Sequence, residues 1–447
     1  MLLSQIPFLF FVFPLISSIE IDLQLQMVPK SLTVSTKYYA DNDFYYFIPI
    51  CLGTPLQCMN ALYETNFTHL IINPIPSEQS HHFVMESSTS VTDLKKTVSP
   101  SELYGDAIND KLLISIYQFN FDFIHGHPSS TRFQSFDGVF GFGNEYDTLD
   151  KVYNNSFSVI KMLKEEGRIK NRLFGHKYFD DRRFIRLYIG EITDNTFIEK
   201  FGNGKGYPKC DMKKSKKALK DINKHLEHLW SCSLNEITIL TESPIEIDNS
   251  EGYVIFSTGS NTISGPLSQG EIIIKEILKD SQLSEKCKEI YFNGGKLNLI
   301  CAWSLDLYSF PKIQFSFSGV NLILDPTNLF YKEYDIKGEN FVFKARFEFG
   351  SEYKYWTFGQ PILRNYDMIF DMDDNSVGFW NAESVPISKK TFLKSLGTIV
   401  IIVIILSIIV GAIIFYIKWK KEHSPEYQRQ KRLYSKIEKL QDIEMSQ

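Results

Sequence analysis

The chain has 447 residues, a formal net charge of -5 at pH 7 and an aromatic content of 14%. This length allows two or three domains, each large enough to bury a core of its own. The mild acidity argues against a polyanionic partner, so we expect no nucleic-acid binding. The many Phe and Tyr residues favour a strand-rich fold over a helical bundle.

The N-terminus carries an apolar run, Ile6–Ile16, that ends in the small residues Ser17 and Ser18. A short apolar run followed by small residues is typical of a secretory signal peptide. The sequence therefore predicts a signal peptide over residues 1–18, although no Lys or Arg precedes the run.

Short apolar runs separated by Gly, Pro and Asn recur over residues 45–116 and again over residues 229–380. Runs of this length and punctuation are typical of β-strands. Helical spacing of apolar residues is scarce, and we expect short helices at Val159–Glu166 and Glu271–Asp280. The ectodomain is therefore predicted to be all-β.

Lysines crowd the segment 203–228, which differs in composition from its surroundings. Such a segment can be a basic docking patch, but a solvated insertion between two halves is the simpler interpretation. We accordingly expect an N-terminal lobe over residues 19–190 and a C-terminal lobe over residues 191–388, with the insertion in the second.

Leu396–Ile417 contains no charged residue over 22 positions, which is long enough to span a bilayer as a helix. Lysines follow directly, which favours a cytoplasmic tail over residues 418–447. Together with the signal peptide, this predicts a single-pass type I membrane protein. Its ectodomain would be extracellular or lumenal, at the plasma membrane or in a secretory or endolysosomal organelle.

The six cysteines fit no metal-binding spacing, and an oxidising compartment makes disulfides the expected state. Six cysteines allow 15 connectivities. Proximity along the chain favours the pairs Cys51–Cys58, Cys210–Cys232 and Cys287–Cys301. Asn66 and Asn154 lie in Asn-x-Ser/Thr motifs and are glycosylation acceptors if exposed.

Two landmarks occur twice in the same order. Tyr63–Phe67 and Phe256–Ser260 each follow an apolar strand, and each is followed downstream by an apolar segment that ends in Gly, at Phe136–Gly141 and Tyr355–Gly359. Such internal repetition suggests two duplicated β lobes whose turns face each other.

These segments resemble the pepsin family of aspartic proteases over most of the ectodomain. Tyr46–Gln57 is similar to the first strand and Gly-Thr-Pro turn of that family, and Trp356–Asp371 is similar to its C-terminal run. The resemblance implies a bilobal fold with a central cleft, an extended peptide or protein ligand, a monomeric ectodomain and no cofactor.

In that family both turns read Asp-Thr-Gly. Here the first turn reads Glu64-Thr65-Asn66 and the second reads Ser257-Thr258-Gly259. The family's hydrolysis needs two carboxylates that share one proton, one acting as acid and the other as base. A serine hydroxyl cannot take either part near neutral pH, and the longer Glu64 misplaces its oxygens. The resemblance therefore implies a pseudoprotease.

Other residues near the turns permit further interpretations. Asn66 stands where the family has a glycine, which can supply a positive φ or a close backbone approach. His69 could serve Ser257 as a base, but we find no oxyanion hole and prefer an inherited serine at a non-catalytic site. The resemblance places Tyr104 as the flap tyrosine over the cleft.

Histidine pairs could suggest a metal, but they lack further ligands at usable spacing, so we expect none: His81-His82 and His125-x-His127. Two alternatives to a peptide-binding pseudoprotease remain. One is an active aspartic endopeptidase centred on Glu64. The other is a structural or adhesive ectodomain whose cleft is filled by Phe67 and Ile71.

Overall fold

The computed structural model describes most of residues 19–382 and short helical stretches between 410 and 434. The described ranges are 19–28, 43–73, 83–98, 105–126, 137–144, 158–179, 184–201, 206–222, 226, 228–292, 295–317, 319–334, 340–380 and 382. Met1–Val385 forms one compact unit, and Pro386–Gln447 forms a second.

No helix within the described ranges is both long and apolar enough to cross a membrane. Most of the expected span over residues 396–417 lies outside those ranges, as does the expected signal peptide over residues 1–18. Both therefore stay predictions.

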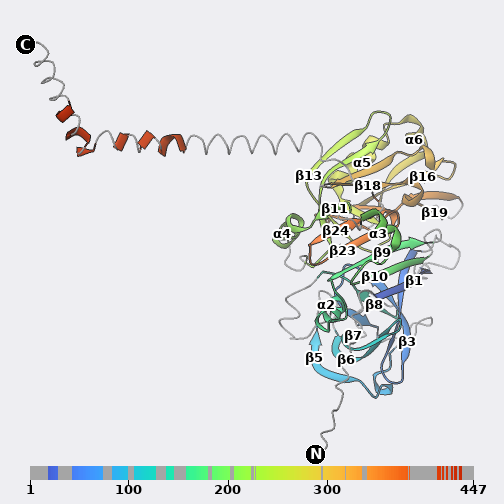
Figure 1. Cartoon of the computed structure of the whole chain (residues 1–447). Coiled ribbons are helices and arrows are strands. Elements are labelled where there is room, and N and C mark those ends of the chain that lie inside the picture. Colours follow the sequence, from blue (N-terminus) through green and yellow to red (C-terminus); the bar gives the residue numbers. More distant parts are fainter. Residues whose placement is uncertain are drawn as a thin grey trace, which may run out of the picture. The chain divides into compact units, whose positions relative to one another are not determined.

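The first unit is mostly β, as expected, and its described strands form two large sheets (Figure 1). In the first sheet the strands lie in the order β11-β24-β23-β9-β10-β1-β2-β3-β8-β4-β7-β6-β5. Their bounds are β1 Ile19–Val28, β2 Asp43–Leu52, β3 Gln57–Glu64, β4 Leu70–Ile72, β5 Thr92–Val98, β6 Gly105–Ile114, β7 Tyr117–Gly126, β8 Gly138–Gly141, β9 Leu173–Phe179, β10 Phe184–Ile189, β11 Lys209–Asp211, β23 Met368–Asp371 and β24 Ser376–Phe379.

The second sheet has the order β18-β17-β12-β13-β22-β14-β21-β16-β20-β19, and β15 pairs with β16 beside this path. It is built from the later part of the chain alone. The bounds are β12 Ser231–Leu240, β13 Ile245–Phe256, β14 Ile263–Pro266, β15 Cys287–Phe292, β16 Lys296–Ala302, β17 Lys312–Phe317, β18 Val320–Leu324, β19 Phe330–Tyr334, β20 Phe341–Ala345, β21 Phe347–Gly350 and β22 Trp356–Phe358.

The described helices of the first unit are short. The two helices expected from apolar spacing are present as α2 and α5, with α5 beginning four residues earlier than expected. The α-helices are α2 Val159–Glu165, α3 Asn195–Phe201, α4 Lys213–Ile222, α5 Leu267–Ile277, α6 Ser281–Lys286, α7 Pro326–Leu329 and α8 Gln360–Leu363, and the 3-10 turns are η1 Met85–Ser87 and η5 Leu307–Ser309.

The repeated landmarks of the sequence correspond to a repeated strand arrangement. In the first half β3 runs parallel to β8, β8 pairs antiparallel with β4, and β4 runs parallel to β7. In the second half β13, β22, β14 and β21 repeat the same three pairings in the same order. Each arrangement holds one turn, after β3 or after β13, and this confirms the duplication.

Strands from both halves join within the first sheet, three strands from its β11 end. β23 of the late chain pairs with β9, and β1 pairs with both β10 and β2; Figure 1 shows β9, β10, β23 and β24 between the two groups of strands. The core is likewise shared, because Phe174 stacks on Phe370 at 4.7 Å between ring centroids. The lobe limits at residues 190 and 191 stay a prediction.

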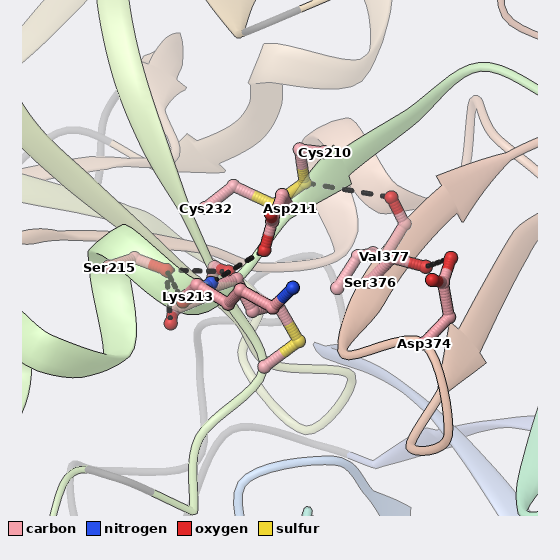
Figure 2. Close-up of a disulfide and its surroundings, with 10 residues drawn as sticks. Cys210, Asp211, Lys213, Ser215, Cys232, Asp374, Ser376 and Val377 are labelled. Atoms are coloured by element: carbon pink, nitrogen blue, oxygen red, sulfur yellow. Dashed lines mark hydrogen bonds between the residues drawn. A yellow bond between two sulfur atoms is a disulfide. The ribbon is translucent and has the colours of Figure 1, made fainter.

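All three expected disulfides are confirmed: Cys51–Cys58, Cys210–Cys232 and Cys287–Cys301. The first and third join residues that face each other on paired strands. The second joins β11 to β12, and Figure 2 shows it beside Val377 of β24, whose carbonyl oxygen lies 3.6 Å from Cys210 Sγ.

The described part of the lysine-rich segment packs on the second sheet, and its role as an insertion stays a prediction. It contains β11 and α4, and α4 buries Ser215 and Leu219 completely while Lys213 and Lys217 are exposed. Ser215 Oγ lies 2.9 Å from the carbonyl oxygens of both Met212 and Ser231, which share its one proton (Figure 2). The disulfide and these hydrogen bonds attach the basic helix to the second sheet.

Candidate functional site

The structure brings together Glu64 and Ser257, the two residues that the resemblance places at the positions of the aspartates. Glu64 is the last residue of β3, and Ser257 directly follows β13. Both are buried, with 6% and 3% of their surface exposed. Ser257 Oγ donates to Glu64 Oε1 at 3.2 Å and lies 3.5 Å from Oε2. The Glu64 carboxyl group and the Ser257 hydroxyl therefore meet where the two turns face each other.

The threonines of the two turns hold each other reciprocally. The backbone N–H of Thr65 donates to Thr258 Oγ1 at 3.1 Å, and the N–H of Thr258 donates to Thr65 Oγ1 at 3.2 Å. Each hydroxyl also donates across the interface, Thr65 Oγ1 to Phe256 O at 2.8 Å and Thr258 Oγ1 to Tyr63 O at 2.9 Å. The scaffold that faces one turn toward the other is thus intact.

The Glu64 carboxyl group reaches across to the second turn. It accepts from the N–H of Asn66 at 2.8 Å and from Ser257, and it also interacts with the backbone N–H groups of Thr65 and Gly259. An ideal Cβ placed on Gly259 would overlap Glu64 Oε2 and lie 2.9 Å from Cδ. The extra methylene therefore directs the carboxyl into the space above Gly259.

Burial raises the pKa of Glu64 from its ordinary value of 4.5 to about 7. The hydrogen bonds from Asn66, Ser257, Thr65 and Gly259 oppose this shift, since each favours the charged carboxylate. Desolvation exceeds their combined effect, so the neutral acid is the main form at acidic pH.

A positive φ, one of the two reasons considered for a glycine at the turn, does not apply to Asn66 or Gly259. Neither Asn66 nor Gly259 is among the described residues with positive φ. Gly259 is instead required by close approach, because Glu64 fills the volume that a side chain would need. At Asn66 the backbone accepts an ordinary side chain, which explains how a non-glycine residue fits the first turn.

His69 is buried, and desolvation, with a smaller effect of His228, lowers its pKa to about 3. Its Nδ1 lies 2.7 Å from Thr68 Oγ1, while Ser257 donates to Glu64. A base this weak cannot activate a serine hydroxyl efficiently. The arrangement gives no support to a Ser257–His69 nucleophile.

The apolar residues of the first turn are packed against strands. Phe67 packs on a cluster of Phe47, Leu62 and Val139. Ile71 lies in β4 between β7 and β8 and is 5% exposed. The idea that these two side chains fill a cleft stays a prediction.

Two buried polar residues next to the turns were not identified from the sequence. Gln360 is 2% exposed, and its Nε2 donates to Thr258 O at 2.5 Å. His176 is fully buried, and its Nδ1 lies 3.2 Å from the hydroxyl of Tyr63, the residue before Glu64. For Gln360 the signal was available, since it directly follows the repeated Phe-Gly landmark; for His176 no local pattern exists.

Several predicted residues lie outside the described ranges: Tyr104, Asn154, His81, His82 and His127. Asn66 is half-buried, and its Oδ1 is buried without a hydrogen-bond partner; glycosylation at Asn66 stays a prediction. Among the described residues, no group of three or more His, Cys, Asp or Glu side chains could hold a metal ion.

Comparison with known proteins places these turns in context. The sequence model of one family, described as eukaryotic aspartyl protease, matches residues 45–382. The chain is 23% identical to pepsin A of Sus scrofa over 354 residues, which cover 76% of this chain and 81% of that protein. It is 22% identical to pepsin-3 of Oryctolagus cuniculus (80% and 87% covered) and 22% identical to renin of Echis ocellatus (78% and 82% covered).

Proposed function

Because the chain belongs to the eukaryotic aspartyl protease family, we propose that it is a non-catalytic, membrane-anchored member that binds a peptide or protein segment. The observation that carries the proposal is the hydrogen bond of 3.2 Å between Ser257 Oγ and Glu64 Oε1. It puts a hydroxyl beside the Glu64 carboxyl group, at the position where hydrolysis by two carboxyls would need the second.

Peptide hydrolysis by two carboxyls needs one group to take a proton from water while the other donates a proton to the carbonyl oxygen. Glu64 can be a neutral acid below pH 7 or a carboxylate above it, but it cannot be both at once. Ser257 cannot supply the missing state, because an alcohol neither ionises nor accepts a proton readily in this range. Water activation by this mechanism therefore lacks a partner.

The scaffold is retained although the reacting group is replaced. The reciprocal threonine bonds hold the two turns, and both strand arrangements around them are complete. Recognition of an extended peptide depends on backbone pairing and side-chain pockets rather than on acid–base groups. Binding without turnover is therefore compatible with every contact described.

Hydrolysis is tested with the purified full chain and a mixed peptide library from pH 3 to 7. The Glu64→Asp, Ser257→Asp double variant and the Glu64→Gln variant are assayed beside it. We expect no cleavage by the wild type. Cleavage by the double variant alone would show that only the two aspartates were missing, and cleavage by the wild type that Glu64→Gln abolishes would overturn the proposal.

The second candidate function is an endopeptidase centred on Glu64, which wild-type cleavage abolished by Glu64→Gln would indicate. One observation favours it: a buried carboxyl with a pKa of about 7 can act as either acid or base near neutrality. Wild-type cleavage should then follow a pH profile that changes near 7 and disappears in Glu64→Gln.

Membrane anchoring is proposed from the uncharged segment Leu396–Ile417 and the lysines after it. The test places one epitope tag after Gln447 and another at residue 386 in intact cells. Protease added outside sealed cells or microsomes of lumen-out orientation should remove the second tag and spare the first. Removal of both tags would exclude a type I topology.

A further inference from the structure

The C-terminal unit carries a helical segment that the proposed function does not use. Residues 425, 427–429 and 432–434 are helical. Ser424 caps this segment, because its Oγ accepts from the N–H of Tyr427 at 3.2 Å and its carbonyl accepts from the N–H of Gln428 at 3.1 Å. Pro425 follows at the first helical position, where the fixed φ of proline is favourable. The helical segment therefore begins directly after Ser424.

Three large apolar side chains of this segment are exposed. Tyr427, Leu433 and Tyr434 are 39%, 59% and 72% exposed. Positions seven apart on a helix lie on one face, so Tyr427 and Tyr434 share a face, and Leu433 lies beside them. In the sequence, Ile437 and Leu440 follow at helical spacing. We call the side chains of Tyr427, Leu433 and Tyr434 the tail face; neighbouring exposed apolar side chains of this kind mark a surface that binds another apolar surface.

Exposed arginines lie beside the tail face. Arg429 and Arg432 are three residues apart and therefore lie together on one side of the helix. Lys436 and Lys439 repeat this spacing in the sequence. Residues 418–447 contain eight Lys or Arg against five Asp or Glu. An apolar face flanked by cations is typical of a helix that lies in the plane of a membrane surface, because the apolar side chains enter the lipid and the cations contact acidic headgroups.

The chain itself limits how far this helix can lie from a bilayer. The expected span ends at Ile417, and Ser424 follows seven residues later, which is at most about 25 Å along an extended chain. Trp and Tyr are enriched where a span meets the membrane surface, and here Tyr416 and Trp419 are exposed and stack with 6.4 Å between ring centroids. So short a tether gives the helix a high effective concentration at the lipid, and weak contacts are then enough for docking.

We propose that the tail face docks on the anionic lipid surface of the membrane that anchors the chain. Tyr427, Leu433 and Tyr434 enter the boundary between headgroups and acyl chains, and Arg429 and Arg432 contact the acidic headgroups. The inference rests on the membrane anchor of the proposed function and goes beyond it by giving the tail a lipid partner. A protein with an apolar groove is the competing occupant, but the positive charge and the short tether favour lipid.

The test places one fluorescent label at a time in the full chain, reconstituted in lipid nanodiscs. All six native cysteines form disulfides, so a new thiol can be labelled selectively with NBD, which doxyl-labelled lipid quenches when the label enters the bilayer. Leu433→Cys puts the label on the tail face. Gln428→Cys is the matched control, at an exposed position on another side of the helix. In nanodiscs of equal parts phosphatidylcholine and phosphatidylserine, we expect quenching at position 433 and little at position 428.

The arginines are tested with the double variant Arg429→Gln, Arg432→Gln in the chain labelled at position 433. Each basic residue near an anionic surface strengthens binding about fivefold, so the ratio of docked to free helix should fall about thirtyfold. The two fluorescence lifetimes of NBD, in lipid and in water, measure this ratio. The matched control Arg429→Lys, Arg432→Lys keeps both charges and should dock like the wild type.

Quenching at neither position, or equal quenching at both, would overturn the docking of the tail face on lipid. Equal quenching at position 433 in nanodiscs of phosphatidylcholine alone would overturn the anionic surface as the partner. Chains that do not incorporate into nanodiscs would contradict the membrane anchor of the proposed function, so a failure of the anchor is distinguishable from a failure of the tail face.

Discussion

At the scale of single residues, Glu64 makes stability depend on pH. A carboxyl whose pKa rises from 4.5 to about 7 on folding binds its proton more tightly in the folded state. The stabilisation from protonated Glu64 is therefore fully present below pH 4.5 and is lost as the pH rises through 7. Its loss lowers the free energy of unfolding by about 3 kcal/mol at most.

The pH-dependent stabilisation by Glu64 is tested by chemical denaturation of the wild type and the Glu64→Gln variant from pH 4.5 to 8. The difference in free energy of unfolding between the two should change by up to about 3 kcal/mol across this range. Glu289→Gln, at an exposed position on β15, should show no such change. A difference that stays constant with pH would contradict the buried carboxyl.

His176 should act in the opposite direction. Desolvation lowers the pKa of His176 to about 3 in the folded chain. Between pH 6.5 and 3 the imidazole is therefore protonated in the unfolded chain but neutral in the folded chain. Stability is then lost as pH falls below 6.5, by about 2 kcal/mol at pH 5. His176→Gln should reduce the loss between pH 7 and pH 5 by that amount, as measured by denaturation midpoints at the two values.

At the scale of elements, the two turns are joined by hydroxyl groups rather than by apolar packing alone. Each threonine hydroxyl accepts one N–H and donates to one carbonyl of the opposite turn. Thr65→Val or Thr258→Val leaves a buried N–H and a buried carbonyl unsatisfied. We expect each variant to lower the free energy of unfolding by about 2 to 4 kcal/mol.

The matched control for the threonine pair is Thr238→Val. Thr238 is similarly buried, at 5% exposure, but its described side-chain bond is a local one to Glu236 at 2.8 Å. The Thr238→Val variant should lower the free energy of unfolding by about 1 kcal/mol. Equal losses at positions 65, 258 and 238 would mean that the cross-turn bonds contribute little.

At the scale of the whole molecule, the first unit should fold cooperatively and not as two independent lobes. The first sheet takes β23 and β24 from the late chain, and Trp230 Nε1 donates to Phe142 O at 2.7 Å across the halves. A fragment of residues 19–190 would expose the edge of β9 that pairs with β23.

We therefore expect the fragment 19–190 to aggregate or to unfold without cooperativity, and co-expression with residues 191–447 to restore a soluble complex. Thermal circular dichroism and size-exclusion chromatography of both preparations measure this. A soluble fragment with a sharp transition of its own would show that the lobes fold separately.

The sequence by itself determined the family and the strand-rich duplication, and it predicted that Glu64 and Ser257 stand at the positions of the two aspartates. These follow from local patterns: Gly-Thr-Pro after an apolar strand, Ser-Thr-Gly before Gly265-Pro266, and the repeated Phe-Gly landmarks. The disulfide pairs also followed, because each joins cysteines close together in the chain.

Only the tertiary structure decided where the Glu64 carboxyl lies and what its pKa is. Glu64 and Ser257 are separated by 193 positions, and no local pattern encodes how far a longer side chain reaches across an interface. The sequence predicted misplaced oxygens, and the structure shows that Glu64 Oε2 fills the volume that a Cβ at Gly259 would need. Burial by both halves, which no single segment specifies, then raises the pKa, because a charge loses its hydration only when the folded chain surrounds it.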